Sequence, residues 1–281
     1  MNTFFQKKIL LIGLLVITLA NGQNKNKSGT LFIIGGGSRP VEMVQRIIRE
    51  SEIDKGGYGV ILPMASSEPD SAIFYAKKQF TKLGMKNIVG FNFSKNEKIA
   101  PTRLDSLRNA NLIYISGGDQ DRFMQAIKNT PVEQAIHENY QNGGMIAGTS
   151  AGAAVMSKKM ITGTELKHPE YHSTFLHLEK DNLELKEGLG LIKNVIIDQH
   201  FVRRSRYNRL LTAVIEFPEI TGIGIDESTA ILIRNNISEV VGESQVIVIS
   251  NPDKPVNNSK EKLAAKNIKM SIYLNGDKFK M

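Results

Sequence analysis

The chain has no cysteine and no tryptophan, and aromatic residues make up only 7% of its 281 residues. Without cysteine there is no disulfide, no thiol nucleophile, no thiolate metal ligand and no attachment point for a lipid on a cysteine. Hydrophobic residues nevertheless make up 41% of the chain. A packed apolar core must therefore hold the fold together.

Long apolar runs are also scarce, and the longest lies near the N-terminus. Two lysines precede the apolar residues 9–20, and small residues follow. This pattern is typical of a secretory signal peptide, residues 1–22, followed by a polar linker over 23–29. The alternative is a membrane anchor, but the run is short against the roughly 20 residues that span a bilayer. We therefore expect a secreted or periplasmic protein that does not touch the membrane after cleavage.

Charge of one sign does not dominate. The formal net charge is +8, and without the two lysines of the signal peptide 34 basic residues face 28 acidic ones, which leaves +6. The lysine-rich stretch 254–280 also contains acidic, amide and apolar residues. The chain has no basic stripe with interleaved aromatics of the kind that binds nucleic acid, so no nucleic-acid partner is expected.

The glycines in "IIGGGSR" (33–39) lack the spacing of a dinucleotide or Walker loop and predict a tight turn.

Apolar runs that favour strands alternate with segments of helical periodicity. Such alternation predicts an α/β fold with a largely parallel sheet, here as one domain over 30–281 with a polar insertion near 166–189. The predicted strands cover 30–37, 58–66, 87–93, 111–118, 144–150, 190–201, 221–236, 245–250 and 269–279. The predicted helices cover 38–52, 70–84, 122–141 and 202–217. In parallel sheets, functional groups gather where the strands end.

The candidate nucleophile is Ser150, in the G-x-S-x-G pattern "GTSAG" at the end of a predicted strand. This pattern marks either a strand-to-helix elbow that exposes a reactive serine or a tight turn that happens to contain one. A reactive serine needs a base, an acid that orients the base, and donors for the oxyanion. The donors expected here are the backbone N–H groups of Ala151 and Gly118.

Of the five histidines, His200 is the best candidate for the base because it ends the apolar strand "VIIDQHF". His137 lies in a predicted helix, and the other three lie in the polar insertion, at His168, His172 and His177. The candidates for the orienting acid are Glu165, Glu170 and Asp198. Four arginines follow His200, and arginine binds carboxylates through two parallel hydrogen bonds. They form either a solvated helix face or a pocket for a carboxylate-bearing substrate: Arg203, Arg204, Arg206 and Arg209.

Four segments in this order, "GGDQDR", "AGTSAGAAVM", "IIDQHFVRRSRYNRL" and "GIGIDESTA", resemble the cyanophycinases. These enzymes belong to a serine peptidase family that also contains the aspartyl dipeptidases. The resemblance covers most of residues 30–250. It implies a flavodoxin-like three-layer α/β sandwich, a dimer, and a Ser–His–Glu triad that needs no cofactor and no metal.

By this resemblance Ser150 is the nucleophile, His200 the base and Glu165 the acid. The family commonly has Asn where this chain has Ser228, a shorter hydrogen-bonding side chain. The remaining positions that match the family's substrate pocket are Gln120, Asp198, Gln199, Arg204, Arg206 and Arg209.

The resemblance also implies a substrate class. Cyanophycin is a poly-aspartate with arginine on each β-carboxyl group, and cyanophycinases release β-Asp-Arg dipeptides from it. The arginines would then bind an aspartyl or terminal carboxylate, and Asp198, Gln199 and Gln120 would meet the arginyl part. Two alternatives stay open: an aspartyl dipeptidase acting on short Asp-X peptides, and an inactive carboxylate-binding protein on the same scaffold.

Overall fold

The computed structural model describes residues 29–170, 172, 174–251, 253 and 261–281. The predicted signal peptide 1–22 lies outside the described residues, as does the predicted linker except for Gly29. Within the described ranges, no helix combines the length and the apolar character that crossing a membrane requires.

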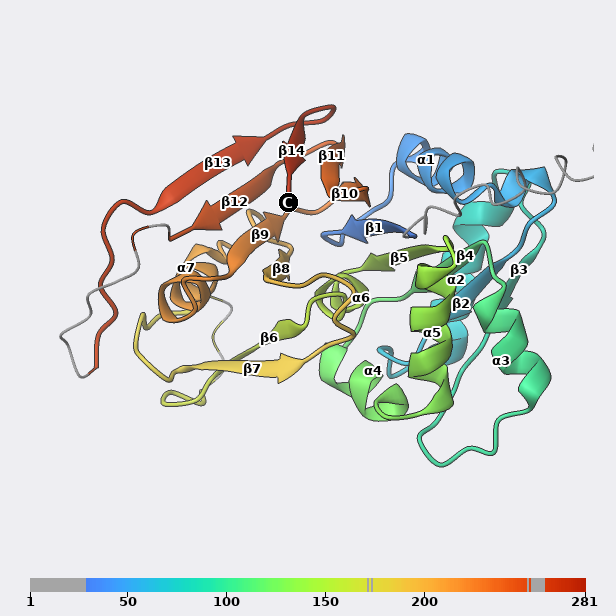
Figure 1. The fold of residues 1–281 in the computed structure, drawn as a ribbon, viewed down its shortest axis with the longest axis horizontal. Coiled ribbons are helices and arrows are strands. Elements are labelled where there is room, and N and C mark those ends of the chain that lie inside the picture. The colour runs from blue at the N-terminus through green and yellow to red at the C-terminus, as the bar shows by residue number, and fades with distance from the viewer. Residues whose placement is uncertain (1–28, 171, 173, 252, 254–260) are drawn as a thin grey trace, which may run out of the picture.

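A mixed eight-stranded sheet forms the centre of the fold, in the order β14-β11-β10-β1-β5-β4-β2-β3 (Figure 1). The five strands from β1 to β3 in this order are parallel, and β10, β11 and β14 extend the sheet antiparallel. The predicted α/β class with a mostly parallel sheet is therefore confirmed. The strands are β1 (Thr30–Ile34), β2 (Gly59–Leu62), β3 (Ile88–Gly90), β4 (Leu112–Ile115), β5 (Met145–Thr149), β10 (Thr229–Arg234), β11 (Ile237–Gly242) and β14 (Lys278–Lys280).

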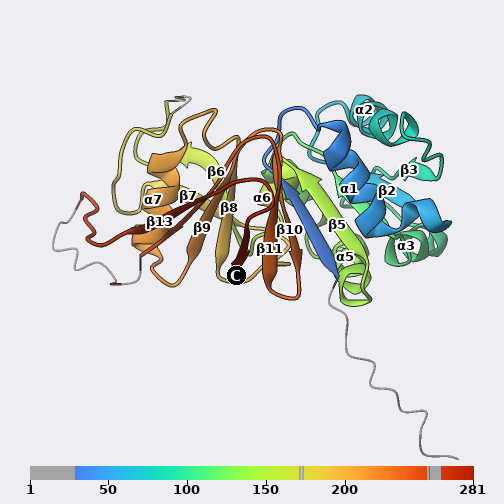
Figure 2. The same cartoon turned by 90° about the horizontal axis from the view of Figure 1, so that it is seen from above.

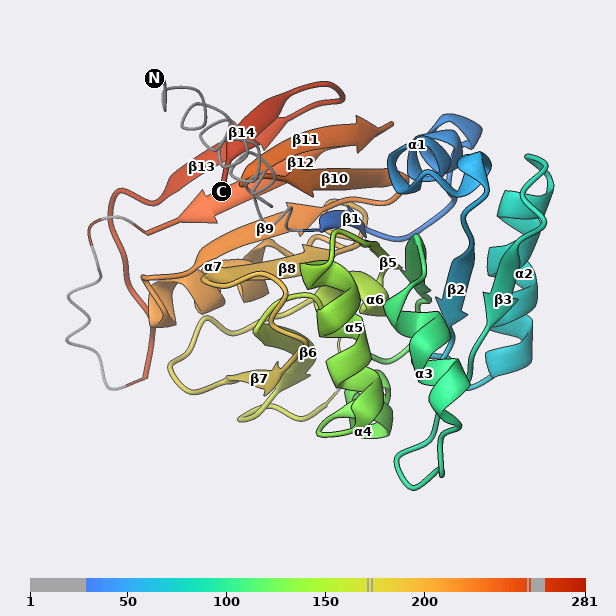
Figure 3. The ribbon, with the colours of Figure 1, turned by 45° about the vertical axis from the view of Figure 1, so that its right-hand side comes forward.

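Helices cover both faces of this sheet, as expected for a three-layer sandwich (Figure 3). α1 and α2 pack on one face, where Val44, Ile47 and Ile48 recur at helical spacing and are buried. α3, α4, α5 and the short α6 pack on the other face. The bounds are α1 (Val41–Ser51), the 3-10 turn η1 (Ile53–Lys55), α2 (Pro69–Thr81), α3 (Pro101–Arg108), α4 (Gln120–Ile127), α5 (Pro131–Gln141) and α6 (Ala151–Ala154).

The predicted helix over 122–141 is two helices, because Pro131 has no N–H to continue the first one. Pro131 instead begins α5, and the Thr130 side chain caps it by accepting a hydrogen bond from the Val132 N–H.

A second, four-stranded sheet lies beside the first, in the order β13-β12-β9-β8 (Figure 2). Successive side chains of its strand β8 point to opposite faces and pack in two different cores. Val195 and Ile197 pack in the core of the main sheet, whereas Ile196 packs against α7. Since β8 and β9 are parallel, both end at the same edge. The elements are β8 (Val195–Gln199), α7 (Tyr207–Glu216), β9 (Thr221–Ile225), β12 (Val246–Ser250) and β13 (Lys269–Tyr273). The sequence did not predict this division into two sheets.

The polar insertion is held against the second sheet by a two-stranded ribbon. β6 (Lys159–Glu165) pairs with β7 (Leu183–Glu187), so the insertion includes a strand that its polarity did not suggest. Phe175 is buried against the α7 core, and its carbonyl accepts a hydrogen bond from the Asn208 side chain. The insertion therefore packs against α7, the helix that begins after the turn following β8.

Candidate active site

Ser150 lies at a sharp turn between β5 and α6, with φ 54° and ψ −113°. A non-glycine residue seldom adopts positive φ, and such strain costs on the order of 1–3 kcal/mol. The two flanking glycines permit the turn: a Cβ at Gly148 would lie 2.2 Å from the Gly152 carbonyl oxygen, and one at Gly152 would lie 2.4 Å from that of Ile115. The elbow alternative for "GTSAG" therefore fits the geometry.

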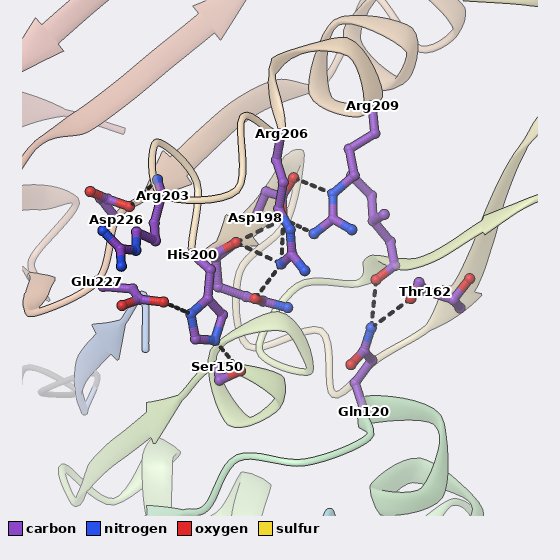
Figure 4. A network of polar contacts seen from close by, with 12 residues as sticks. Gln120, Ser150, Thr162, Asp198, His200, Arg203, Arg206, Arg209, Asp226 and Glu227 are labelled. Atoms are coloured by element: carbon purple, nitrogen blue, oxygen red, sulfur yellow. Dashed lines mark hydrogen bonds and ion pairs between the residues drawn. The ribbon is translucent and has the colours of Figure 1, made fainter. Parts of the chain in front are cut away.

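His200 follows β8 and meets Ser150 across the boundary between the two sheets. Ser150 Oγ and His200 Nε2 are 2.8 Å apart (Figure 4). The end of β1 and the residue after it join the two, since the Ile34 carbonyl accepts the Ser150 N–H and the Gly35 carbonyl accepts the His200 N–H. The sequence-predicted pair of Ser150 and His200 is thus brought together by a third element.

Glu227 is the carboxylate that contacts the histidine. Its Oε1 lies 2.7 Å from His200 Nδ1. With the imidazole proton on Nδ1, that N–H donates to Glu227, and Nε2 is free to accept the Ser150 hydroxyl proton. Glu227 follows β9, which ends at the same edge as β8. Ser150, His200 and Glu227 therefore form an unbroken nucleophile–base–acid relay.

The expectation that Glu165 orients His200 is wrong. Both oxygens of the buried Glu165 carboxylate are occupied elsewhere, by the Leu176 N–H, by His177 Nδ1 at 2.8 Å and by the Asn182 side-chain amide. Burial opposes the ionisation of Glu165, but these three hydrogen bonds outweigh it and lower its pKa. Glu165 therefore anchors the polar insertion to the end of β6.

The other two candidate acids also lie away from this role. Glu170 is exposed in the insertion. Asp198 is 1% exposed and makes a bidentate ion pair with Arg209, which is itself 7% exposed. The assignment of Asp198 and Arg209 to substrate contacts is therefore corrected: they neutralise each other and fix α7 onto the second sheet.

Three further predicted pocket residues, Gln199, Arg206 and Gln120, bind other groups of the protein in this structure. Gln199 accepts a hydrogen bond from Arg206 through Oε1, and its carbonyl accepts a second from the same guanidinium at 2.7 Å. Gln120 is buried and donates through Nε2 to the carbonyls of Ile161 and Thr162 on β6 (Figure 4). These contacts hold the three side chains within the protein instead of presenting them freely to solvent.

The predicted oxyanion donors lie beside Ser150. Ala151 is the first residue of α6, so its N–H has no acceptor within that helix. A Cβ at Gly117 would lie 3.9 Å from Ser150 Oγ, which places the turn carrying Gly118 next to the serine. Gly118 has φ 138°, and a Cβ there would lie 2.1 Å from the Ala65 carbonyl oxygen, so only glycine fits.

Ser228 and Arg204 are the last two predicted substrate-binding residues, and each is close in sequence to a member of the relay. The Ser228 N–H donates to the Gly36 carbonyl, and its hydroxyl is 3.0 Å from that of the exposed Ser38. Arg204 is exposed and lies close enough to His200 to affect its titration. Of the predicted carboxylate-binding arginines, Arg204 is the one that both faces solvent and acts on the base.

The surroundings keep His200 neutral. Burial lowers its pKa below the ordinary value, and the positive charges of Arg204 and Arg206 lower it further. The hydrogen bond to Glu227 acts in the opposite direction without reversing the shift. A histidine in this state is unprotonated at neutral pH, so its Nε2 is available to accept a proton during the reaction. Within the described ranges, His, Asp and Glu side chains form no group of three or more arranged to hold a metal ion.

The fold and the relay define a class: an α/β protein with a serine-hydrolase active site. Residues 31–241 match the family model described as "Peptidase family S51". The chain belongs to this family and is a serine peptidase.

Two curated relatives agree with this assignment, and a solved structure agrees with the fold. The chain is 31% identical to a cyanophycinase of Nostoc sp. over 89% of its own length and 84% of the relative. A cyanophycinase of Trichormus variabilis matches with the same identity and coverage. A crystal structure of a peptidase from an acI-B1 Actinobacterium superposes with a TM-score of 0.65 at 24% identity, covering 91% of this chain and 98% of that one, and so supports the fold.

Proposed function

We propose that the protein is an exopeptidase that hydrolyses cyanophycin or related β-aspartyl peptides and releases β-Asp-Arg dipeptides. The observation that carries the proposal is the relay from Ser150 through His200 to Glu227, with contacts of 2.8 and 2.7 Å. The substrate class is supported by the two relatives named cyanophycinase and by the exposed Arg204 beside the base.

In the proposed mechanism, Ser150 Oγ attacks the scissile carbonyl while His200 Nε2 takes the hydroxyl proton. Glu227 stabilises the imidazolium that forms, and the N–H groups of Ala151 and Gly118 bind the oxyanion. His200 then returns the proton to the leaving amine, which leaves an acyl group on Ser150. A water molecule, activated by His200, hydrolyses this ester and restores the serine.

The substrate would be held by its charges. Arg204, exposed near His200, would bind an aspartyl or terminal carboxylate. Asp198 is buried and paired with Arg209, so it takes no part in the proposed binding of the arginyl part. Ser228, in place of the family's Asn, leaves a shorter side chain at the rim beside Ser38.

Mass spectrometry of the products tests this proposal. The purified protein is incubated with cyanophycin in one reaction and with a set of Asp-X dipeptides in another, and Ser150→Ala is the matched control. Release of β-Asp-Arg from the polymer by wild type alone is the expected result. Cleavage of Asp-X dipeptides without attack on the polymer would identify an aspartyl dipeptidase, and no cleavage of either would favour a carboxylate-binding protein.

We also propose that the protein is exported, cleaved before Gln23, and forms a homodimer. The export proposal rests on the N-terminal pattern of residues 1–22, and the dimer on the resemblance to the family. N-terminal sequencing of the protein recovered from the periplasm or medium tests the first. Light scattering on the purified protein tests the second, and a monomeric mass would overturn it.

A further inference from the structure

Asp226 and Glu227 are consecutive residues that directly follow β9. Their carboxylates bind two different groups of the turn that follows β8, residues 200–206. Glu227 binds the His200 side chain, whereas Asp226 Oδ1 accepts the backbone N–H of Arg203 at 2.8 Å (Figure 4). The turn also closes on itself, since the Arg204 N–H donates to the His200 carbonyl. Asp226 is only 7% exposed. The backbone that carries the imidazole is therefore fixed from the same strand end as the imidazole itself.

The second oxygen of Asp226 connects this strand end to the loop between β11 and β12. Ser244 Oγ donates to Asp226 Oδ2 at 2.7 Å. The Ser244 N–H donates to Thr229 Oγ1, and that hydroxyl donates to the Glu227 carbonyl at 3.1 Å. One serine thus supports both acidic residues, through the side chain of Asp226 and the backbone of Glu227.

The backbone conformation of His200 makes the position of its imidazole sensitive to these hydrogen bonds. His200 has φ 50°, so the chain leaves β8 in the left-handed region at the residue that carries the base. A small rotation of the turn moves the imidazole relative to Ser150. Displacing a reacting group by about 1 Å can lower the rate about 100-fold.

We propose that Asp226, held by Ser244, is a positioning residue that sets the orientation of His200 through the Arg203 N–H. Its catalytic consequence rests on the proposed function, because it presumes that His200 acts as the base. The positioning itself does not depend on which substrate the enzyme cleaves. The alternative is that Asp226 contributes only to the stability of the fold.

Two measurements on one set of variants separate these roles. The first is an NMR titration of His200, assigned by comparison with His200→Gln, which reports the environment of the imidazole whether or not the protein is active. The second is the rate at which a serine-directed phosphonate inactivates the protein, followed by intact mass. The variants are Asp226→Ala, Asp226→Asn and Ser244→Ala, and Ser94→Ala, in an exposed loop, is the control.

Asp226→Ala should slow inactivation about 10- to 100-fold and move the His200 titration toward 6.5, since a loosened turn admits water to the imidazole. Asp226→Asn keeps an acceptor for the Arg203 N–H and should stay close to wild type. Ser244→Ala should change both readouts in the same direction by less, and it carries the test if Asp226→Ala does not fold.

The proposal is overturned if the folded variants keep the wild-type titration and inactivation rate, or if Asp226→Asn loses as much as Asp226→Ala. If wild type resists the phosphonate while the variants still shift the His200 titration, the proposed function fails and the positioning role stands.

Discussion

Gly36 lies against the imidazole of His200: a Cβ built on this glycine would be 2.3 Å from Cε1 and 2.5 Å from Nε2. Its φ of 112° is a conformation that favours glycine. Gly36→Ala should therefore push the imidazole away from Ser150 and lower the rate of phosphonate inactivation about 100-fold.

Gly84→Ala is the matched control for this prediction. Gly84 also has a positive φ, of 86°, but a Cβ there meets nothing within 4 Å. Both variants carry the backbone strain of a side chain at positive φ, and only Gly36→Ala adds the contact with His200. Equal inactivation rates for the two would show that the contact does not matter.

The lowered pKa of His200 predicts how kcat/KM depends on pH on the acidic side of its profile. The base works only when neutral, so kcat/KM should fall as the pH drops through the pKa of His200, which lies below 6.5. The charge of Arg204 is one cause of this depression. Arg204→Gln should therefore move the limb to higher pH, whereas Arg49→Gln on the exposed side of α1 should not. A limb that stays in place in Arg204→Gln would contradict the assigned cause.

The buried pair of Asp198 and Arg209 predicts a stability effect. Asp198→Ala leaves the Arg209 guanidinium buried without its carboxylate and should lower the free energy of unfolding by about 3–5 kcal/mol. The double variant Asp198→Leu/Arg209→Met should recover most of this loss. Lys55→Ala removes an exposed, solvent-screened ion pair with Glu52 and should lower the free energy of unfolding far less. Urea unfolding measures all three, and a loss no larger for Asp198→Ala than for Lys55→Ala would refute the structural role.

Ser150→Ala should abolish nearly all turnover, with a loss of about 10³- to 10⁶-fold in kcat, because the nucleophile is removed. The fold should be retained, since alanine removes only one hydroxyl group. Product formation from the substrate identified by mass spectrometry gives the rate, and circular dichroism verifies the fold. Wild-type turnover by the folded variant would rule out the serine mechanism.

The sequence predicted those parts of the site that depend on local patterns. Ser150 and His200 each follow an apolar strand, at the strand ends where functional groups gather. That the two strands belong to different sheets was not predicted. The same rule applied to "GIGIDES" points to Glu227, whereas the match to the family placed the acid at Glu165. The error arose because the partner of His200 lies 27 residues further along the chain, just after the neighbouring strand β9.

Charge pairing was the second feature that the sequence did not reveal. Asp198 and Arg209 are 11 residues apart and meet only because α7 packs back onto β8. The side chains of Gln120 and Arg206 likewise contact backbone carbonyls whose positions depend on the ribbon and on the turn after β8. A residue's type indicates what it can bind, but tertiary packing decides whether that partner is substrate or protein.

The identity of the orienting acid is tested most directly by comparing Glu227→Gln with Glu165→Gln in phosphonate inactivation of Ser150. Glu227→Gln should slow inactivation by up to about 10⁴-fold, because an amide in place of the carboxylate no longer holds the Nδ1–H tautomer of His200. Glu165→Gln should keep a rate near wild type, since its contacts lie in the insertion. Slow inactivation of Glu165→Gln together with a wild-type rate for Glu227→Gln would contradict the Ser150–His200–Glu227 relay.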